Sequence, residues 1–200
     1  MGLLQKNPYE LNPEAVIILL AVEGEVTERD YFNAVSFCVA PPEGRQWQLE
    51  IQAAPFGSGL SAPRQVLSRA LEFHALHNYP MPNLTWLILD SDVQHIRDLQ
   101  SGLIAEIKDA GFNLCLSNPC FEVWLWLHEA DLPTDTAHIA SDLKRHLPLD
   151  LTAWRTDADA DRIKQAIRRA EALPGSAATP FPDNPGTQLA ALFRYLGFAA

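Results

Sequence analysis

The chain has 200 residues, of which 48% are hydrophobic and 20% charged, and its formal net charge is −10. These values are typical of a globular protein that forms one domain, or one domain with an appendage, around a sizeable hydrophobic core. The acidic balance argues against nucleic-acid binding driven by bulk electrostatics. It still allows a local basic patch, or a metal ion that bridges to phosphate.

Two features indicate a cytoplasmic protein that does not associate with membranes. The apolar run Ala15–Val22 is too short to span a bilayer, and it lacks the basic leader of a signal peptide. The three cysteines stand at irregular positions and suggest no disulfide framework, as expected in a reducing compartment. The sequence leaves the oligomeric state open.

The run Ala15–Val22 predicts a strand that is buried on both faces, as in a parallel sheet. Gly24 gives the backbone the freedom that a sharp strand-to-helix turn often needs, and a helix is expected to follow from Thr27, its N-cap. Glu23 would therefore lie at the carboxyl end of a buried strand, where open α/β sheets bind their ligands. Two further acids are expected to be solvated or to cap that helix: Glu25 and Glu28.

Strands and helices alternate through the middle of the chain. Further strands are predicted at Trp47–Ile51, Leu84–Leu89 and Phe112–Leu116. Helices are predicted at 64–78, from Val93 to a C-cap at Gly111, and from Asn118 as N-cap with Pro119 as the first helical residue. This alternation predicts an α/β fold with a mostly parallel sheet flanked by helices.

The pattern changes after about His128, where helical segments follow one another. They are predicted at 136–147, 158–173 and 187–197, and no strand pattern remains. We therefore divide the chain into a loose N-terminal lead-in, an α/β core and a C-terminal helical extension packed on that core: residues 1–14, 15–130 and 131–200.

Acidic residues follow two of the predicted core strands. Asp90 and Asp92 come directly after the strand Leu84–Leu89, as Glu23 comes after the first strand. If these strands are neighbours, the three carboxylates converge, and like charges at close range raise one another's pKa. A hard divalent cation such as Mg²⁺, held by carboxylates, water and substrate phosphate, removes this conflict. The alternative is that the acids are solvated charges and helix caps in loops.

Several strings of residues carry a resemblance to known families. Glu23-Gly24 after one strand and Asp90-x-Asp92 after a later one resemble the Toprim metal site of topoisomerases, bacterial primases and related nucleases. More narrowly, EGEVTERDYF at 23–32 and SNPCFEVWLWLH at 117–128 resemble the RloB-like family. RloB-like proteins are bacterial proteins found in restriction-modification loci and linked to phage defence. Asn184-Pro185-Gly186-Thr187 before the last helix also fits, so the resemblance spans about residues 15–197.

The resemblance implies a Toprim-like core that holds Mg²⁺ (or Mn²⁺) at Glu23, Asp90 and Asp92. In the Toprim pattern the glutamate is the candidate general acid/base and the aspartates are metal ligands. RloB-like chains often carry a basic residue between the two aspartates and another acid just after them. This chain has Ser91 and Val93 at those positions.

A few residues outside these strand ends are further candidates. Glu122 interrupts an almost wholly apolar segment, and it is either a carboxylate favoured by a helix N-terminus or a fourth acid that faces the metal site. Asn118 either caps the helix or contacts substrate. Lys144, Arg145 and Arg168 either lie on solvated helix faces or track phosphate. The basic clusters are not interleaved with aromatic residues, so they predict no stacking platform for single strands.

These observations support one leading hypothesis and two alternatives. The leading hypothesis is a metal-dependent nuclease or phosphodiesterase that acts on DNA or RNA in bacterial phage defence, with Glu23, Asp90, Asp92 and Glu122 as its catalytic residues. The first alternative is a non-catalytic interaction or sensor subunit of a restriction-modification or abortive-infection system, with a protein partner. The second is a nucleotide-binding α/β domain, which the lack of a GxxxxGK[ST] or GxGxxG loop argues against.

Overall fold

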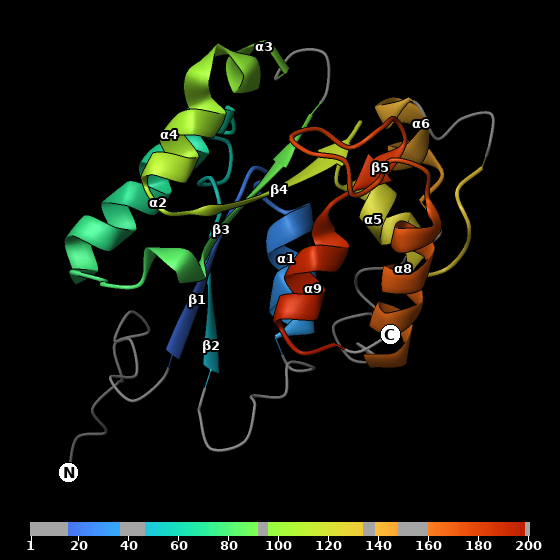
Figure 1. Ribbon diagram of the computed structural model, residues 1–200, viewed down its shortest axis with the longest axis horizontal. Coiled ribbons are helices and arrows are strands. Elements are labelled where there is room, and N and C mark those ends of the chain that lie inside the picture. Colours follow the sequence, from blue (N-terminus) through green and yellow to red (C-terminus); the bar gives the residue numbers. More distant parts are fainter. Residues whose placement is uncertain (1–15, 37–46, 92–95, 134–138, 148–159, 199–200) are drawn as a thin grey trace.

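A computed structural model describes residues 16–36, 47–91, 96–133, 139–147 and 160–198. The predicted lead-in 1–14 and the candidate metal ligand Asp92 lie outside these residues. A central five-stranded sheet has the order β2-β1-β3-β4-β5, with helices on both of its faces (Figure 1). The predicted α/β fold with a mostly parallel sheet is therefore confirmed.

The first and third strands form the buried centre of the sheet. Strand β1, Val16–Val22, pairs in parallel with β2, Trp47–Gln52, on one side and with β3, Thr85–Asp90, on the other. Strand β4, Asn113–Asn118, pairs in parallel with β3. The apolar runs of β1 and β3 are buried almost throughout, as a strand covered on both faces requires.

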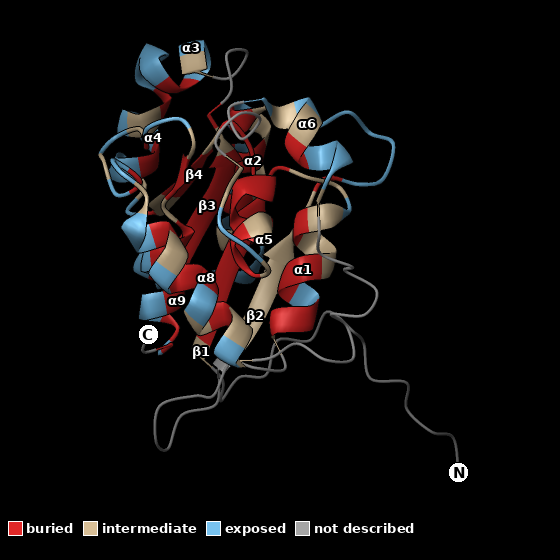
Figure 2. Cartoon of the chain, turned by 90° about the vertical axis from the view of Figure 1, so that its right-hand side faces the viewer, coloured by how far each residue is buried: buried red, intermediate tan, exposed pale blue. Residues whose placement is uncertain are grey.

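Alternate side chains of β1 enter two separate hydrophobic clusters. Leu19 and Ala21 pack under α2, Pro63–His77, and α4, Ile104–Asp109. Ile18, Leu20 and Val22 face the opposite layer of helices. Figure 1 shows these two layers, and Figure 2 shows the buried strands between them. The helices of the second layer are α1, Thr27–Val35; α5, Glu122–Leu127; α8, Ala160–Ala172; and α9, Leu189–Tyr195.

The predicted start of α5 is wrong by three residues, since the first helical residue is Glu122 and not Pro119. Asn118 is neither an N-cap nor followed by a first helical turn, because it is the last residue of β4 and pairs with Gly186. Its side-chain amide donates a hydrogen bond to the carbonyl oxygen of Pro182, at 3.0 Å. The helix begins at Glu122, where its predicted apolar body is buried.

The helix predicted from Val93 to Gly111 is interrupted within its described part. It consists of α3, Ile96–Asp98, a π-helical turn at Leu99–Leu103 and then α4. Gly102 has a φ of +106°, which is outside the helical region and favours glycine. The apolar residues of this segment still recur on one face, so their spacing alone does not reveal the interruption.

The C-terminal part of the chain contains one strand that the sequence pattern does not predict. Strand β5, Gly186–Thr187, pairs antiparallel with the end of β4. It is too short for an alternating pattern, and α9 starts just after it. Helix α6, Ala140–Arg145, falls within the predicted helix 136–147. The division into core and extension at residue 130 stays a prediction.

Two smaller points complete the fold. A short 3₁₀ turn, Pro82–Leu84, leads into β3. In the part of the chain that the structure describes, no helix combines the length and the apolar character that a membrane crossing needs.

Candidate functional site

The carboxyl ends of β1 and β3 bring two of the predicted acids together. The two strands are neighbours in parallel register, with Val22 opposite Ile88. Glu23 accepts a hydrogen bond from the backbone N–H of Asp90, from N to Oε2 over 3.0 Å. Its own backbone N–H donates to the carbonyl oxygen of Ile88, at 3.2 Å. The two acidic strand ends are thus joined directly.

The N-cap residue of α5, Phe121, also contacts Asp90. The backbone N–H of Phe121 donates to Oδ1 of Asp90 over 2.8 Å. This contact uses one of the N–H groups that a helix N-terminus leaves without an intrahelical partner. Glu122, the next residue, is 9% exposed, and its Oε2 lies 3.8 Å from Nζ of Lys144. Helix α6 therefore supplies a cation to the acid that begins α5.

Glu28, which is expected from the sequence to be solvated or to cap the helix, is a member of this site. It is only 7% exposed, and it accepts a hydrogen bond from the backbone N–H of Gly24, from N to Oε1 over 3.1 Å. A Cβ on residue 24 would lie 1.7 Å from Oε2 of Glu28, so any larger residue there would displace the carboxylate from this position. Glu28 is therefore buried and not solvated, and its bond to Gly24 lies outside the helix, whose N-cap Val26 has no side-chain cap hydrogen bond. The glycine four residues before Glu28 is the sequence signal for this contact.

Burial and mutual repulsion shift the proton affinities of these acids. Burial raises the pKa of Glu28 to about 7; backbone hydrogen bonds oppose the shift, and the Glu122 and Glu23 carboxylates add to it. The pKa of Asp90 lies well above its usual range because of burial, with Glu23, Glu28 and Glu122 adding to the shift. Burial lowers the pKa of the Lys144 ammonium, but the nearby acids, chiefly Glu122 and Asp90, outweigh it and raise the pKa overall.

These side chains line a hollow of about 360 Å³ at the carboxyl edge of the sheet. Among the described residues around it, Lys144 is the one cationic side chain. The wall comes from the β1–α1 turn and the start of α1, the end of the β2–α2 loop, the end of β3, the start of α5 and the last turn of α6. Its lining residues are Glu23, Gly24, Glu25, Val26, Thr27, Glu28, Ser61, Asp90, Glu122 and Lys144. We refer to it as the acidic pocket.

The other residues predicted to contact nucleic acid lie elsewhere. Arg145 is exposed on α6, next to Lys144, and its Nη1 lies 3.6 Å from Oδ1 of Asp142. Arg168 is exposed on α8. Asn118 is half-buried and bonded to the backbone of the C-terminal segment. Of these candidates the structure brings only Lys144 into the acidic pocket, and the roles of the others stay predictions.

The chemistry of the acidic pocket matches a hard divalent cation, while the described geometry does not complete a metal site. Carboxylate oxygens are the protein ligands that Mg²⁺ takes, and close negative charges favour a cation between them. Within the described ranges, however, no three His, Cys, Asp or Glu side chains are arranged to hold a metal ion. Asp92, which follows Asp90 by two residues, lies outside those ranges. The donor chemistry therefore fits Mg²⁺, and the ligand set is incomplete in what is described.

Fold and site together define an α/β protein with an acidic pocket at the carboxyl ends of two parallel strands. A model of the RloB-like protein family matches residues 18–196, which is most of the chain. The chain therefore belongs to the RloB-like family. Comparisons with curated proteins and with solved structures found no significant match.

Proposed function

We propose that this RloB-like protein is a divalent-metal-dependent phosphodiesterase that cleaves nucleic acid in bacterial phage defence. On this proposal the sheet is a Toprim-like core, and Mg²⁺ or Mn²⁺ binds at Glu23, Asp90 and Asp92. The observation that carries the proposal is the 3.0 Å hydrogen bond from Asp90 N to Glu23 Oε2, since it joins two acids that lie far apart in the sequence. Membership of the RloB-like family supports the defence setting.

Each acid of the proposed site has its own role in hydrolysis. Asp90 and Asp92 are proposed as metal ligands, and Glu122 as a further oxygen donor beside them. Glu23 is the general acid/base, because its carboxylate is fixed at the strand end by the Asp90 backbone. A bound divalent ion would supply charge neutralisation at the phosphate and a more acidic water.

Lys144 supplies a positive charge to a site that otherwise repels phosphate. The chain lacks the basic residue that RloB-like chains often carry between the two aspartates, and Ser91 stands there instead. Lys144 reaches the pocket from α6, with its Nζ 3.8 Å from Glu122 Oε2 and its side chain 54% exposed. An exposed ammonium at the rim can pair with a phosphate oxygen as the substrate enters.

A cleavage assay with single-stranded and double-stranded DNA and RNA tests this proposal. In Mg²⁺ or Mn²⁺ the wild type is expected to cut at least one substrate, and Asp90→Asn is expected to abolish cutting. Asparagine keeps the Oδ1 that accepts from Phe121 N, so the variant removes charge with little change in shape. Lys144→Ala should raise KM. Glu72→Gln, an exposed carboxylate on α2, is the matched control and should cut like the wild type. No cutting under any of these conditions would overturn the proposal.

A second candidate is a non-catalytic interaction or sensor subunit of a defence complex. It is favoured by the lack of a three-ligand group among the described residues and by the net charge of −10. On this view a protein partner co-purifies with the chain, and Glu23→Gln leaves phage protection unchanged. The enzyme proposal requires that the same variant abolish protection.

A further inference from the structure

Phe56 is the most exposed of the large hydrophobic side chains in the described part of the chain, at 83%. It lies in the loop between β2 and α2, residues 53–62, which also carries the partly exposed Leu60. The loop starts from the buried Ala54, so its apolar tip projects from an anchored base.

Two hydrogen bonds tie this loop to the wall of the acidic pocket. The backbone N–H groups of Gly57 and Gly59 both donate to the carboxylate of Glu25, at 2.7 and 3.2 Å. Both glycines have positive φ, +71° and +66°, a conformation that lets neighbouring N–H groups converge on one anion. Glu25 and Ser61 line the pocket, so the residue directly after Phe56 is bonded to its wall.

Arg69 holds the far end of the loop to the acidic strand end. Its Nη1 donates to the carbonyl oxygen of Leu60 over 2.6 Å, and its Nη2 donates to that of Val22 over 2.7 Å. Val22 directly precedes Glu23, the proposed general acid/base. One guanidinium therefore couples the loop to the strand that carries the reactive carboxylate.

We propose that Phe56 is a base-stacking residue, which binds an unpaired nucleobase of the strand whose phosphate enters the acidic pocket. This inference rests on the proposed function and adds the class of substrate, a strand with unpaired bases. Stacking does not depend on charge, so it gives affinity to a protein whose net charge of −10 repels a phosphate backbone. A base that is still paired within a duplex offers no free face to the ring.

Binding of labelled single-stranded DNA and RNA oligonucleotides, followed by fluorescence anisotropy with Mn²⁺, tests the proposal. All proteins carry Glu23→Gln, so that bound strands are not cut. Phe56→Ala should weaken the Kd roughly fivefold to a hundredfold, as expected when a stacked aromatic ring is removed. Phe56→Trp should restore the affinity. Leu76→Ala, which removes a side chain with 81% exposure near the other end of α2, should leave the affinity unchanged.

Oligonucleotides with a single abasic position separate stacking from a general effect of the loop. The protein that retains Phe56 should bind an oligonucleotide with an abasic position at the stacked base more weakly than the intact oligonucleotide. The Phe56→Ala protein should bind the two oligonucleotides with equal Kd. Equal affinities with and without the Phe56 ring, or an abasic effect that persists after Phe56→Ala, would overturn the stacking role while leaving the phosphodiesterase proposal intact. Failure of the protein to bind any oligonucleotide would overturn both.

Discussion

Glu28 illustrates how a single contact changes the character of an ordinary helix-start carboxylate. An acid in the first turn of a helix is usually solvated and favoured by the helix dipole. Here the absence of a side chain on Gly24 lets the Glu28 carboxylate fold back under the β1–α1 turn, where it is buried beside Glu23 and Glu122. The result is a group that holds its proton to about pH 7.

The first prediction concerns the pH dependence of stability at Glu28. Its pKa is raised from 4.5 to about 7 in the folded protein, so folding favours the protonated form. That stabilisation is complete below about pH 4.5 and is lost as the pH rises through 7. Glu28→Gln mimics the protonated carboxyl and keeps an acceptor for Gly24 N. Relative to wild type, it should therefore be about equal in stability at pH 4.5 and more stable by up to ~3 kcal/mol at about pH 8.

Urea unfolding in the presence of a chelator measures this difference directly. The chelator matters because a bound cation would stabilise the ionised carboxylates and hide the effect. Glu72→Gln provides a matched loss of an exposed carboxylate and should show a smaller change between the two pH values. A Glu28→Gln variant that is no more stable than wild type at high pH contradicts the burial of this group.

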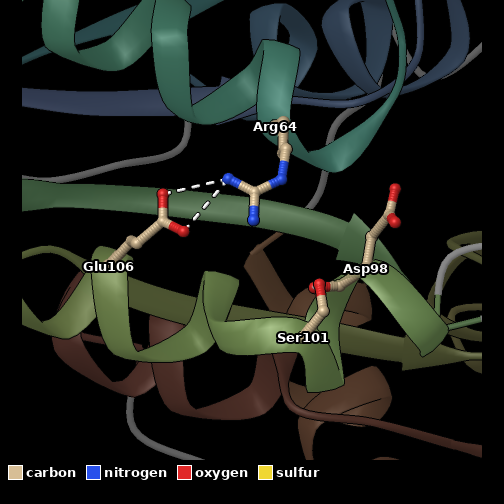
Figure 3. A network of polar contacts seen from close by, with 4 residues as sticks. All are labelled: Arg64, Asp98, Ser101 and Glu106. Atoms are coloured by element: carbon tan, nitrogen blue, oxygen red, sulfur yellow. Dashed lines mark hydrogen bonds and ion pairs between the residues drawn. The ribbon is translucent and has the colours of Figure 1, made fainter.

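At the scale of elements, the layer of α2 and α4 combines a polar contact with apolar packing. Figure 3 shows the ion pair between Arg64 of α2 and Glu106 of α4. Nη1 of Arg64 donates to both carboxylate oxygens, over 3.0 and 3.1 Å. In the same view Ser101, beside the interruption at Gly102, donates to the backbone carbonyl of Asp98. The salt-bridged side chains are about half exposed, whereas Leu103, in the hydrophobic cluster of this layer, is fully buried.

The second prediction ranks these two contributions to stability. Because exposed ion pairs are screened by water, Arg64→Ala should lower the free energy of unfolding by less than about 1 kcal/mol. Leu103→Ala removes buried methyl groups and leaves a cavity, so it should cost about 2–5 kcal/mol. Thermal or urea unfolding of the two variants under the same conditions gives the comparison. The reverse order would mean that the ion pair, and not the core, holds this layer in place.

The elements also show what a pattern in the sequence can and cannot predict. The runs at β1 and β3 are apolar throughout because both faces of these strands are covered, and such runs predict buried strands correctly. The interruption at Gly102 leaves the apolar spacing intact, and β5 has only two residues, so neither produces a periodic signal. Asn118 and Pro119 match the residues of a helix start and so predict α5 too early, while the backbone at Asn118 belongs to the sheet.

At the scale of the whole molecule, the candidate site is only partly readable from the sequence. Glu23 and Asp90 could be placed together because neighbouring parallel strands end at one edge of a sheet. Lys144 and Ser61 could not, because their position depends on how α6 and the β2–α2 loop pack against that edge. Phe56 gave no signal either, since an isolated aromatic residue in a Gly- and Ser-rich loop has no pattern to read.

The central claim is that the acidic pocket binds a divalent cation, and calorimetric titration of Mn²⁺ into the metal-free protein tests it most directly. Wild type should bind the ion, and Asp90→Asn should weaken binding by more than about tenfold. Residues that only hydrogen-bond to metal ligands already contribute about 10–100-fold to affinity, and Asp90 is proposed as a ligand itself. Glu72→Gln should bind like the wild type. No binding by the wild type, or equal binding by Asp90→Asn, would contradict the claim.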